Sequence, residues 1–212
     1  MFYYGSRLPH WHPAGGILFV TARLHGSVPA EAIERMYLEA REAERAAQAE
    51  GATMAAEQLR LDAQRRYFAT LEQHLDNGEA GADWLRRPGV QGAVLAALHH
   101  CHDRQLFALL AASVMPNHLH VVLRLPLRAA PSFKEVWTNF KRFTGREANR
   151  LLKREGRFWE EESYDHAVRS GDEGIGRVIR YTAHNPVKAN LCGMWRAWPG
   201  TWISAEWQPT LP

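Results

Sequence analysis

The order of strand-like and helix-like segments constrains the fold of this 212-residue chain more than any other feature of its sequence. β-rich apolar runs at residues 17–24, 105–115 and 118–125 predict three strands, and residues 157–169 contain a fourth. Helices are expected at residues 90–100 and again between the third and the fourth strand. The order strand, helix, strand, strand, helix, strand is that of a ferredoxin-like α+β fold. We therefore expect an antiparallel sheet with helices on one face.

Local signals place the ends of the later helices. A long helix should begin at Ser132, where Glu135 three residues on completes a capping box. A last helix, at residues 173–184, is expected to stop at Asn185, because Pro186 disfavours helical geometry at the residue before it. The Trp- and Pro-rich tail that follows is not expected to be helical.

An acidic segment interrupts this pattern after the first strand. Two runs rich in Ala, Glu and Arg, which are strong helix formers, lie on either side of Gly51. We expect one domain, residues 1–212, with residues 29–81 as a helical insertion and the last helix as a C-terminal addition.

The net charge of +3 hides an asymmetry along the chain. Residues 31–79 carry six Lys and Arg against eleven Asp and Glu, whereas residues 124–196 carry fifteen against nine. A face that binds a polyanion, next to an unrelated acidic insertion, would produce this pattern. Two solvated faces of opposite sign are the plainer explanation of charge alone.

Composition excludes several classes of protein. Hydrophobic residues make up 46% and charged residues 23% of the chain, which excludes a largely disordered protein. We expect neither a membrane span nor a signal peptide, because no apolar run approaches about 18 residues and the start lacks a basic and then apolar region. With two cysteines, Cys101 and Cys192, a reducing cytoplasm is the expected compartment.

The sharpest local motif is His118-Leu119-His120. Side chains at i and i+2 of a strand point to the same face, so the two imidazoles should converge while Leu119 points the other way. Neutral imidazole is a common ligand of divalent metals. The alternative is an unremarkable pair of histidines at the end of a strand.

Tyr181 and Asn185 form a second candidate pair, because residues i and i+4 share one helix face. Tyrosine can be a covalent nucleophile, but with an ordinary pKa of about 10 it needs help from its surroundings, which a nearby metal can supply. An amide oxygen is a suitable third ligand for magnesium or manganese. A core tyrosine followed by a plain Asn-Pro helix stop is the alternative.

Basic and aromatic residues alternate on the long helix that begins near Ser132, which suits single-stranded nucleic acid, with cations on phosphates and rings under bases. Trp137, Phe140 and Phe143 are equally explained as core residues on an amphipathic helix. Further cations flank Tyr181, and two of these, Arg180 and Lys188, are placed nearest a phosphate. The candidate DNA-binding residues are Lys141, Arg142, Arg146, Arg157, Arg180 and Lys188.

Taken together, several motifs in order resemble one known family. MPNHLHVV, GRFWEEESYDHAVR and VIRYTAHNPVKANL, preceded by LPHWHPAGGILFVTARLHGS, resemble the REP-associated tyrosine transposases, which belong to the single-tyrosine HUH endonuclease superfamily. The resemblance covers the front segment and most of residues 90–204. The insertion matches no motif of the family, and a dimer surface, a steric guard over a DNA groove and filler all remain open for it.

The resemblance implies a metal-dependent DNA transposase of the bacterial cytoplasm that acts at the nucleoid on hairpin-bearing single strands such as REP-like repeats. It implies Mg²⁺ or Mn²⁺ on His118 and His120, with Tyr181 as nucleophile and Asn185 where relatives often have Gln. Tyr181 would form a covalent 5′-phosphotyrosine and release a 3′-hydroxyl, and a second 3′-hydroxyl would reverse the step without a nucleotide cofactor. Relatives include monomers and homodimers that exchange the tyrosine helix.

Two other functions remain open at this point. One is a catalytically idle protein that only binds repeat hairpins. The other is a metal-dependent hydrolase unrelated to DNA, for which the His118/His120 pair is the sole support.

Overall fold

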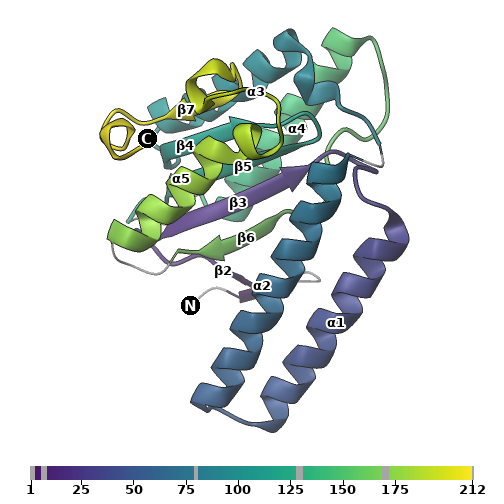
Figure 1. Cartoon of the computed structure of the whole chain (residues 1–212), viewed down its shortest axis with the longest axis vertical. Coiled ribbons are helices and arrows are strands. Elements are labelled where there is room, and N and C mark those ends of the chain that lie inside the picture. Colours follow the sequence, from purple (N-terminus) through teal and green to yellow (C-terminus); the bar gives the residue numbers. More distant parts are fainter. Residues whose placement is uncertain (1–2, 6–8, 79–80, 128–130, 169–171, 212) are drawn as a thin grey trace.

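A five-stranded antiparallel sheet, in the order β6-β3-β5-β4-β7, forms the centre of the molecule (Figure 1). The computed structural model describes residues 3–5, 9–78, 81–127, 131–168 and 172–211. The strands of this sheet are β3 (Ile17–Arg23), β4 (Ala108–Val114), β5 (His118–Arg124), β6 (Tyr164–Ala167) and β7 (Thr201–Ile203). The first four are the predicted strands, and their antiparallel pairing confirms the ferredoxin-like α+β fold.

Two helices cover one face of this sheet, as predicted. Helix α3 (Pro88–Asp103) and helix α4 (Phe133–Leu152) bury apolar side chains against alternate residues of β3 and β5, Leu119 and Val121 among them. The predicted capping box begins α4: the Ser132 hydroxyl accepts a hydrogen bond from the Glu135 amide, and the Glu135 carboxylate accepts one from the Ser132 amide.

The opposite face is also covered by helices, and these are the predicted insertion and the predicted C-terminal helix. Helices α1 (Ala30–Ala49), α2 (Met54–Asn77) and α5 (Asp172–Lys188) pack there, around a second apolar cluster that includes Phe19 of β3 and Val122 of β5. The α1–α2 hairpin is the predicted insertion, and its far end extends well beyond the sheet (Figure 1). Among the described helices, none combines the length and apolar character needed to cross a bilayer.

The last helix does not stop at Asn185, so that prediction is wrong. Helix α5 continues through Pro186 to Lys188. Proline removes one backbone donor, but the turn beyond it is closed by the amides of Ala189 and Leu191, which donate to the carbonyls of Asn185 and Pro186. Tyr181 and Asn185 therefore lie in one continuous helix.

Short elements at both ends escaped the sequence patterns. The tail contains β7, which pairs with β4 through Ala112 and Trp202, and 3₁₀ turns at Trp195–Ala197 and Gln208–Thr210. No α-helix lies among the described residues of the tail, as expected. A small hairpin of β1 (Tyr3–Gly5) and β2 (Pro9–Trp11) precedes the main sheet, and a 3₁₀ turn at Trp84–Arg86 precedes α3. Strands of three residues are too short to show the alternation of apolar and polar residues that predicts a strand.

Candidate active site

Strand β5 brings His118 and His120 to the sheet face that α2 and α5 cover. Both side chains are buried, and their Nε2 atoms lie 3.0 Å apart. Leu119 points into the apolar core on the opposite face. The alternation of the strand thus produces the convergence that the sequence predicts.

The second nitrogen of each ring is held in place. His118 Nδ1 lies 2.7 Å from Asn117 Oδ1, and Asn117 Nδ2 donates to the Leu75 carbonyl of α2. The Asn117 oxygen must therefore accept a hydrogen bond from His118. His118 then carries its proton on Nδ1, and Nε2 has a free lone pair. Burial, together with the neighbouring His120, lowers the pKa of His118 to about 3 and keeps this ring neutral. His120 Nδ1 is held by the Thr21 hydroxyl at 2.9 Å.

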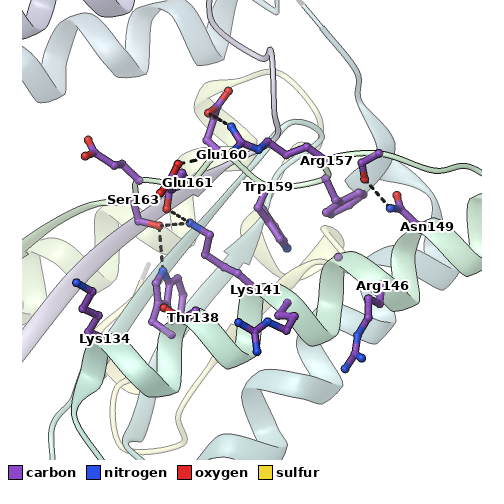
Figure 2. Close-up of a pocket in the computed structure, with 16 residues that line it drawn as sticks. Lys134, Thr138, Lys141, Arg146, Asn149, Arg157, Trp159, Glu160, Glu161 and Ser163 are labelled. Carbon is purple, nitrogen blue, oxygen red and sulfur yellow. Dashed lines mark hydrogen bonds and ion pairs between the residues drawn. The ribbon is translucent and has the colours of Figure 1, made fainter. Parts of the chain in front are cut away.

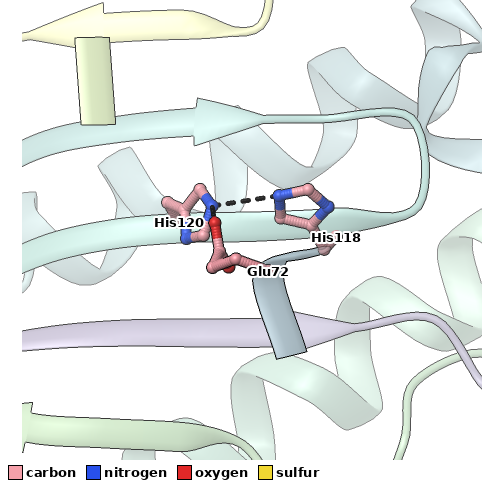
Figure 3. A group of neighbouring side chains, drawn as sticks. All are labelled: Glu72, His118 and His120. Atoms are coloured by element: carbon pink, nitrogen blue, oxygen red, sulfur yellow. Dashed lines mark hydrogen bonds and ion pairs between the residues drawn. The ribbon is translucent and has the colours of Figure 1, made fainter. Parts of the chain in front are cut away.

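Glu72 of α2 is the site residue that sequence reasoning missed. Its carboxylate is buried, and Oε2 lies 3.3 Å from His120 Nε2. Ligand atoms of Glu72, His118 and His120 all lie within 4.8 Å of one another (Figure 3). Burial raises the pKa of the Glu72 carboxyl, but the interactions with both histidines and Tyr181 outweigh it and lower the pKa to about 2. The available signal was a carboxylate on the apolar face of a predicted helix.

Tyr181 of α5 meets the same carboxylate. Its hydroxyl donates a hydrogen bond to Glu72 Oε2, and its ring centroid lies 5.6 Å from that of His120 in the same chain. Burial and the negative charge of Glu72 raise the pKa of Tyr181 above its ordinary value. The phenol is therefore protonated at neutral pH in the protein alone.

Asn185 lies one helical turn after Tyr181 and is only 1% exposed. Neither atom of its amide has a well-formed hydrogen bond among the described residues, and the same is true of Glu72 Oε1. A hydrogen-bonding interaction between the Asn185 side chain and the Tyr181 hydroxyl lowers the pKa of Tyr181, but burial and Glu72 raise that pKa by more.

The donor set of this site fits a divalent cation. Buried oxygens without partners cost free energy, and a cation would satisfy those of Glu72 and Asn185. Two ligand atoms at about 2.1 Å in neighbouring octahedral positions lie about 3.0 Å apart. The two histidine Nε2 atoms have this separation.

The candidate DNA-binding cations are divided between the two faces of the sheet. Lys141, Arg142, Arg146 and Arg157 line a cleft of about 720 Å³ between α4 and residues 156–163 (Figure 2). This cleft lies on the α3–α4 side, away from the histidine pair. Glu160, Glu161 and Glu162 also line it, so its charge is mixed.

Within this cleft the cations differ in their surroundings. Lys141 Nζ donates to the Glu161 carbonyl at 2.6 Å, and burial lowers its pKa to about 8 despite the nearby Glu160. Arg142 and Arg146 are exposed. The aromatic residues of α4 divide as well, because Trp137 and Phe140 are buried in the core while Phe143 is 52% exposed.

The cations of α5 lie on the other side of the sheet, close to Tyr181 in the chain. Lys188 Nζ pairs with Asp76 Oδ2 of α2 at 2.7 Å and remains half-exposed. Arg180 is exposed. The structure therefore places Lys188 against the acidic insertion, which the charge pattern alone treated as separate from the basic half.

Comparisons with known proteins agree with the motifs. No protein-family model matches the chain. A Haemophilus influenzae protein, provisionally named a REP-associated tyrosine transposase, is 27% identical over an alignment of 101 residues. The match covers 44% of this chain and 57% of that protein. The chain thus matches a little over half the length of this curated relative.

One solved structure shares the fold. It is described as a REP-associated tyrosine transposase bound to a REP hairpin, with a TM-score of 0.51, 15% identity, and coverage of 95% of this chain and 82% of that one. At 15% identity, the similarity to this structure is evidence for a shared fold alone. The sequence relative and the structural neighbour together support the resemblance of this chain to the REP-associated tyrosine transposases.

Proposed function

We propose that this protein is a metal-dependent transposase that cleaves and rejoins hairpin-bearing single-stranded DNA through a covalent bond to Tyr181. The observation that carries the proposal is the meeting of His118, His120 and the Tyr181 hydroxyl around one buried carboxylate. A pair of structural histidines would need neither a neighbouring phenol nor unsatisfied oxygens beside it.

His118 and His120 would hold Mg²⁺ or Mn²⁺ through Nε2, with the Asn185 amide oxygen as a further ligand. When bound, such an ion polarises a phosphate and favours the phenolate form of a nearby tyrosine. Asn117 and Thr21 serve this site by fixing the two rings through their Nδ1 atoms.

Tyr181 performs the covalent step. Its hydroxyl oxygen attacks the scissile phosphorus, so an Oη–P bond forms while the bond from phosphorus to the 3′-oxygen breaks. The phenol proton moves along its hydrogen bond to Glu72 Oε2. The 3′-oxygen takes up one proton as it leaves and becomes a hydroxyl, so the step releases and consumes one proton. Attack by another 3′-hydroxyl on the phosphotyrosine reverses these changes and joins two strands. Tyr181 and the histidines belong to one chain, which supports action within one subunit.

Single-stranded DNA with a hairpin is the proposed partner. The structural neighbour is described as bound to a REP hairpin, and the match to it spans most of this chain. Arg180 and Lys188 would meet phosphates beside Tyr181, and the cleft cations Lys141, Arg142 and Arg146 would meet DNA on the other side of the sheet. We propose the bacterial cytoplasm, at the nucleoid, as its place of action.

The test is formation of a covalent adduct. A hairpin-bearing oligonucleotide labelled at its 3′ end is incubated with protein and Mn²⁺ or Mg²⁺, and labelled protein is resolved on a denaturing gel. The wild type should form the adduct, Tyr181→Phe should not, and Tyr37→Phe, the same change at a tyrosine of α1, should form it normally.

Three results would contradict the proposal. An undiminished adduct with Tyr181→Phe would mean that another residue is the nucleophile. Hairpin binding by the wild type without an adduct in either metal would indicate a protein that only binds repeats. Hydrolysis of a small phosphoester, without affinity for single-stranded DNA, would indicate an unrelated hydrolase.

A further inference from the structure

We propose that Glu72 also binds the metal, as a stronger ligand than Asn185, which makes the helical insertion part of the active site. This inference rests on the proposed function and adds a ligand from a segment that matches no family motif. Glu72 lies on α2, outside the ferredoxin-like unit that carries both histidines.

Distances among the donor atoms support a shared ion. Glu72 Oε2 lies 3.3 Å from His120 Nε2, and His120 Nε2 lies 3.0 Å from His118 Nε2. Both separations are close to the roughly 3.0 Å between neighbouring ligands of an octahedral ion. Two imidazoles and one carboxylate leave other positions of such an ion available for a phosphate oxygen and water.

The chemistry of Glu72 also points to a cation. A buried carboxylate is costly unless positive charge or hydrogen bonds compensate it. Oε2 has the His120 and Tyr181 contacts, but Oε1 has no hydrogen-bond partner among the described residues. Oxygen ligands with negative charge suit Mg²⁺ and Mn²⁺ better than a neutral amide does, so Glu72 is a stronger candidate ligand than Asn185.

Helix α2 is attached to the site on both sides of Glu72, which fixes where its carboxylate lies. The Leu75 carbonyl accepts a hydrogen bond from Nδ2 of Asn117, and Oδ1 of the same side chain orients His118. Asp76 pairs with Lys188 on the helix of Tyr181. Leu71 is buried in the apolar cluster beneath α2. The end of α2 thus contacts both the histidine strand and the tyrosine helix.

The test measures metal binding rather than turnover. Mn²⁺ is titrated calorimetrically into wild type, Glu72→Gln and Asp62→Asn without DNA, with circular dichroism and thermal unfolding in EDTA to confirm folding. Asp62→Asn is the matched control, because it makes the same change of charge on α2 at a residue whose contacts are Gln58 and Arg65. Glu72→Gln should weaken Mn²⁺ binding by at least about tenfold, since even indirect partners of a metal cost tenfold or more. Asp62→Asn should bind as the wild type does.

Glu72→Asp provides a second measurement, because it keeps the charge but withdraws the carboxylate by one methylene. We expect weaker Mn²⁺ binding and a smaller Mn²⁺-induced rise in the unfolding temperature than in the wild type. Wild-type affinity in both Glu72 variants, with an active wild type, would overturn this inference and leave the proposed function intact. A wild type that binds no Mn²⁺ and forms no DNA adduct would instead refute the proposed function.

Discussion

The hydroxyl of Tyr181 donates a hydrogen bond to the carboxylate of Glu72, although 109 residues separate the two in the chain. The same carboxylate oxygen approaches His120. One side chain of the insertion therefore connects the candidate nucleophile to the candidate metal ligands. The ion pair between Asp76 and Lys188 crosses the same contact, so the acidic helix α2 lies beside the basic half of the chain with charges of opposite sign facing each other.

Asn117 should matter for metal affinity without touching the metal. Its side-chain oxygen accepts a hydrogen bond from His118 Nδ1 and so selects the tautomer with a lone pair on Nε2. Its side-chain nitrogen donates a hydrogen bond to the Leu75 carbonyl of α2, which holds the oxygen in this position. Asn117→Ala should weaken Mn²⁺ binding by about 10- to 100-fold in a calorimetric titration. Asn149→Ala, on α4, serves as the control and should leave the affinity unchanged. Equal affinities in both variants would show that Asn117 has no such role.

The exposed cations of the cleft beside α4 should affect how DNA affinity depends on salt concentration. If Arg142 and Arg146 each neutralise one phosphate, replacing both with Ala should reduce the slope of log affinity against log salt by about 1.4 for single-stranded DNA. The same double change at Arg41 and Arg45, exposed on α1, should have no such effect. Fluorescence anisotropy across a salt series measures both slopes. An unchanged slope in the cleft variant would place the DNA elsewhere.

Lys141 should make stability depend on pH in the alkaline range. Burial lowers its pKa to about 8 in the folded protein, below the ordinary value of 10.5. The unfolded chain therefore binds more protons between these values, and the free energy of unfolding should rise with pH across this window, by at most about 1.4 kcal/mol per pH unit. Urea unfolding at pH 7.5 to 10 should show a rise that Lys141→Gln lacks. Identical pH profiles in the two proteins would contradict this assignment.

The start of α4 offers a test of stability separate from the active site. Ser132→Ala removes the side chain that caps the Glu135 amide and should lower the free energy of unfolding by about 1 kcal/mol. DNA adduct formation should be unaffected. Ser132→Asp restores a capping oxygen and should recover most of the loss, whereas no recovery would mean that the hydroxyl acts in another way.

Features that depend on neighbours in the chain could be predicted from the sequence. The alternation of a strand brings His118 and His120 to one face wherever that strand lies, and a capping box needs only Ser132 and Glu135 at their spacing. The order of strands and helices likewise indicated the ferredoxin-like sheet, since short connections and antiparallel pairing leave few arrangements. The same reasoning failed at Pro186, where the packing of α5 and the bonds of the following turn outweigh one lost donor.

Glu72 is different in kind, because its one mark in the sequence is a place on the apolar face of a predicted helix, which does not say what that face meets. Its place beside His120 follows from how α2 packs on the sheet, through buried side chains such as Leu71 and Leu75. The division of the DNA-binding candidates between two faces, and the pairing of Lys188 with Asp76, also arise from packing. A residue pattern specifies which side of its own element a group occupies. Which distant element that side meets is set by the burial of apolar surface across the whole chain.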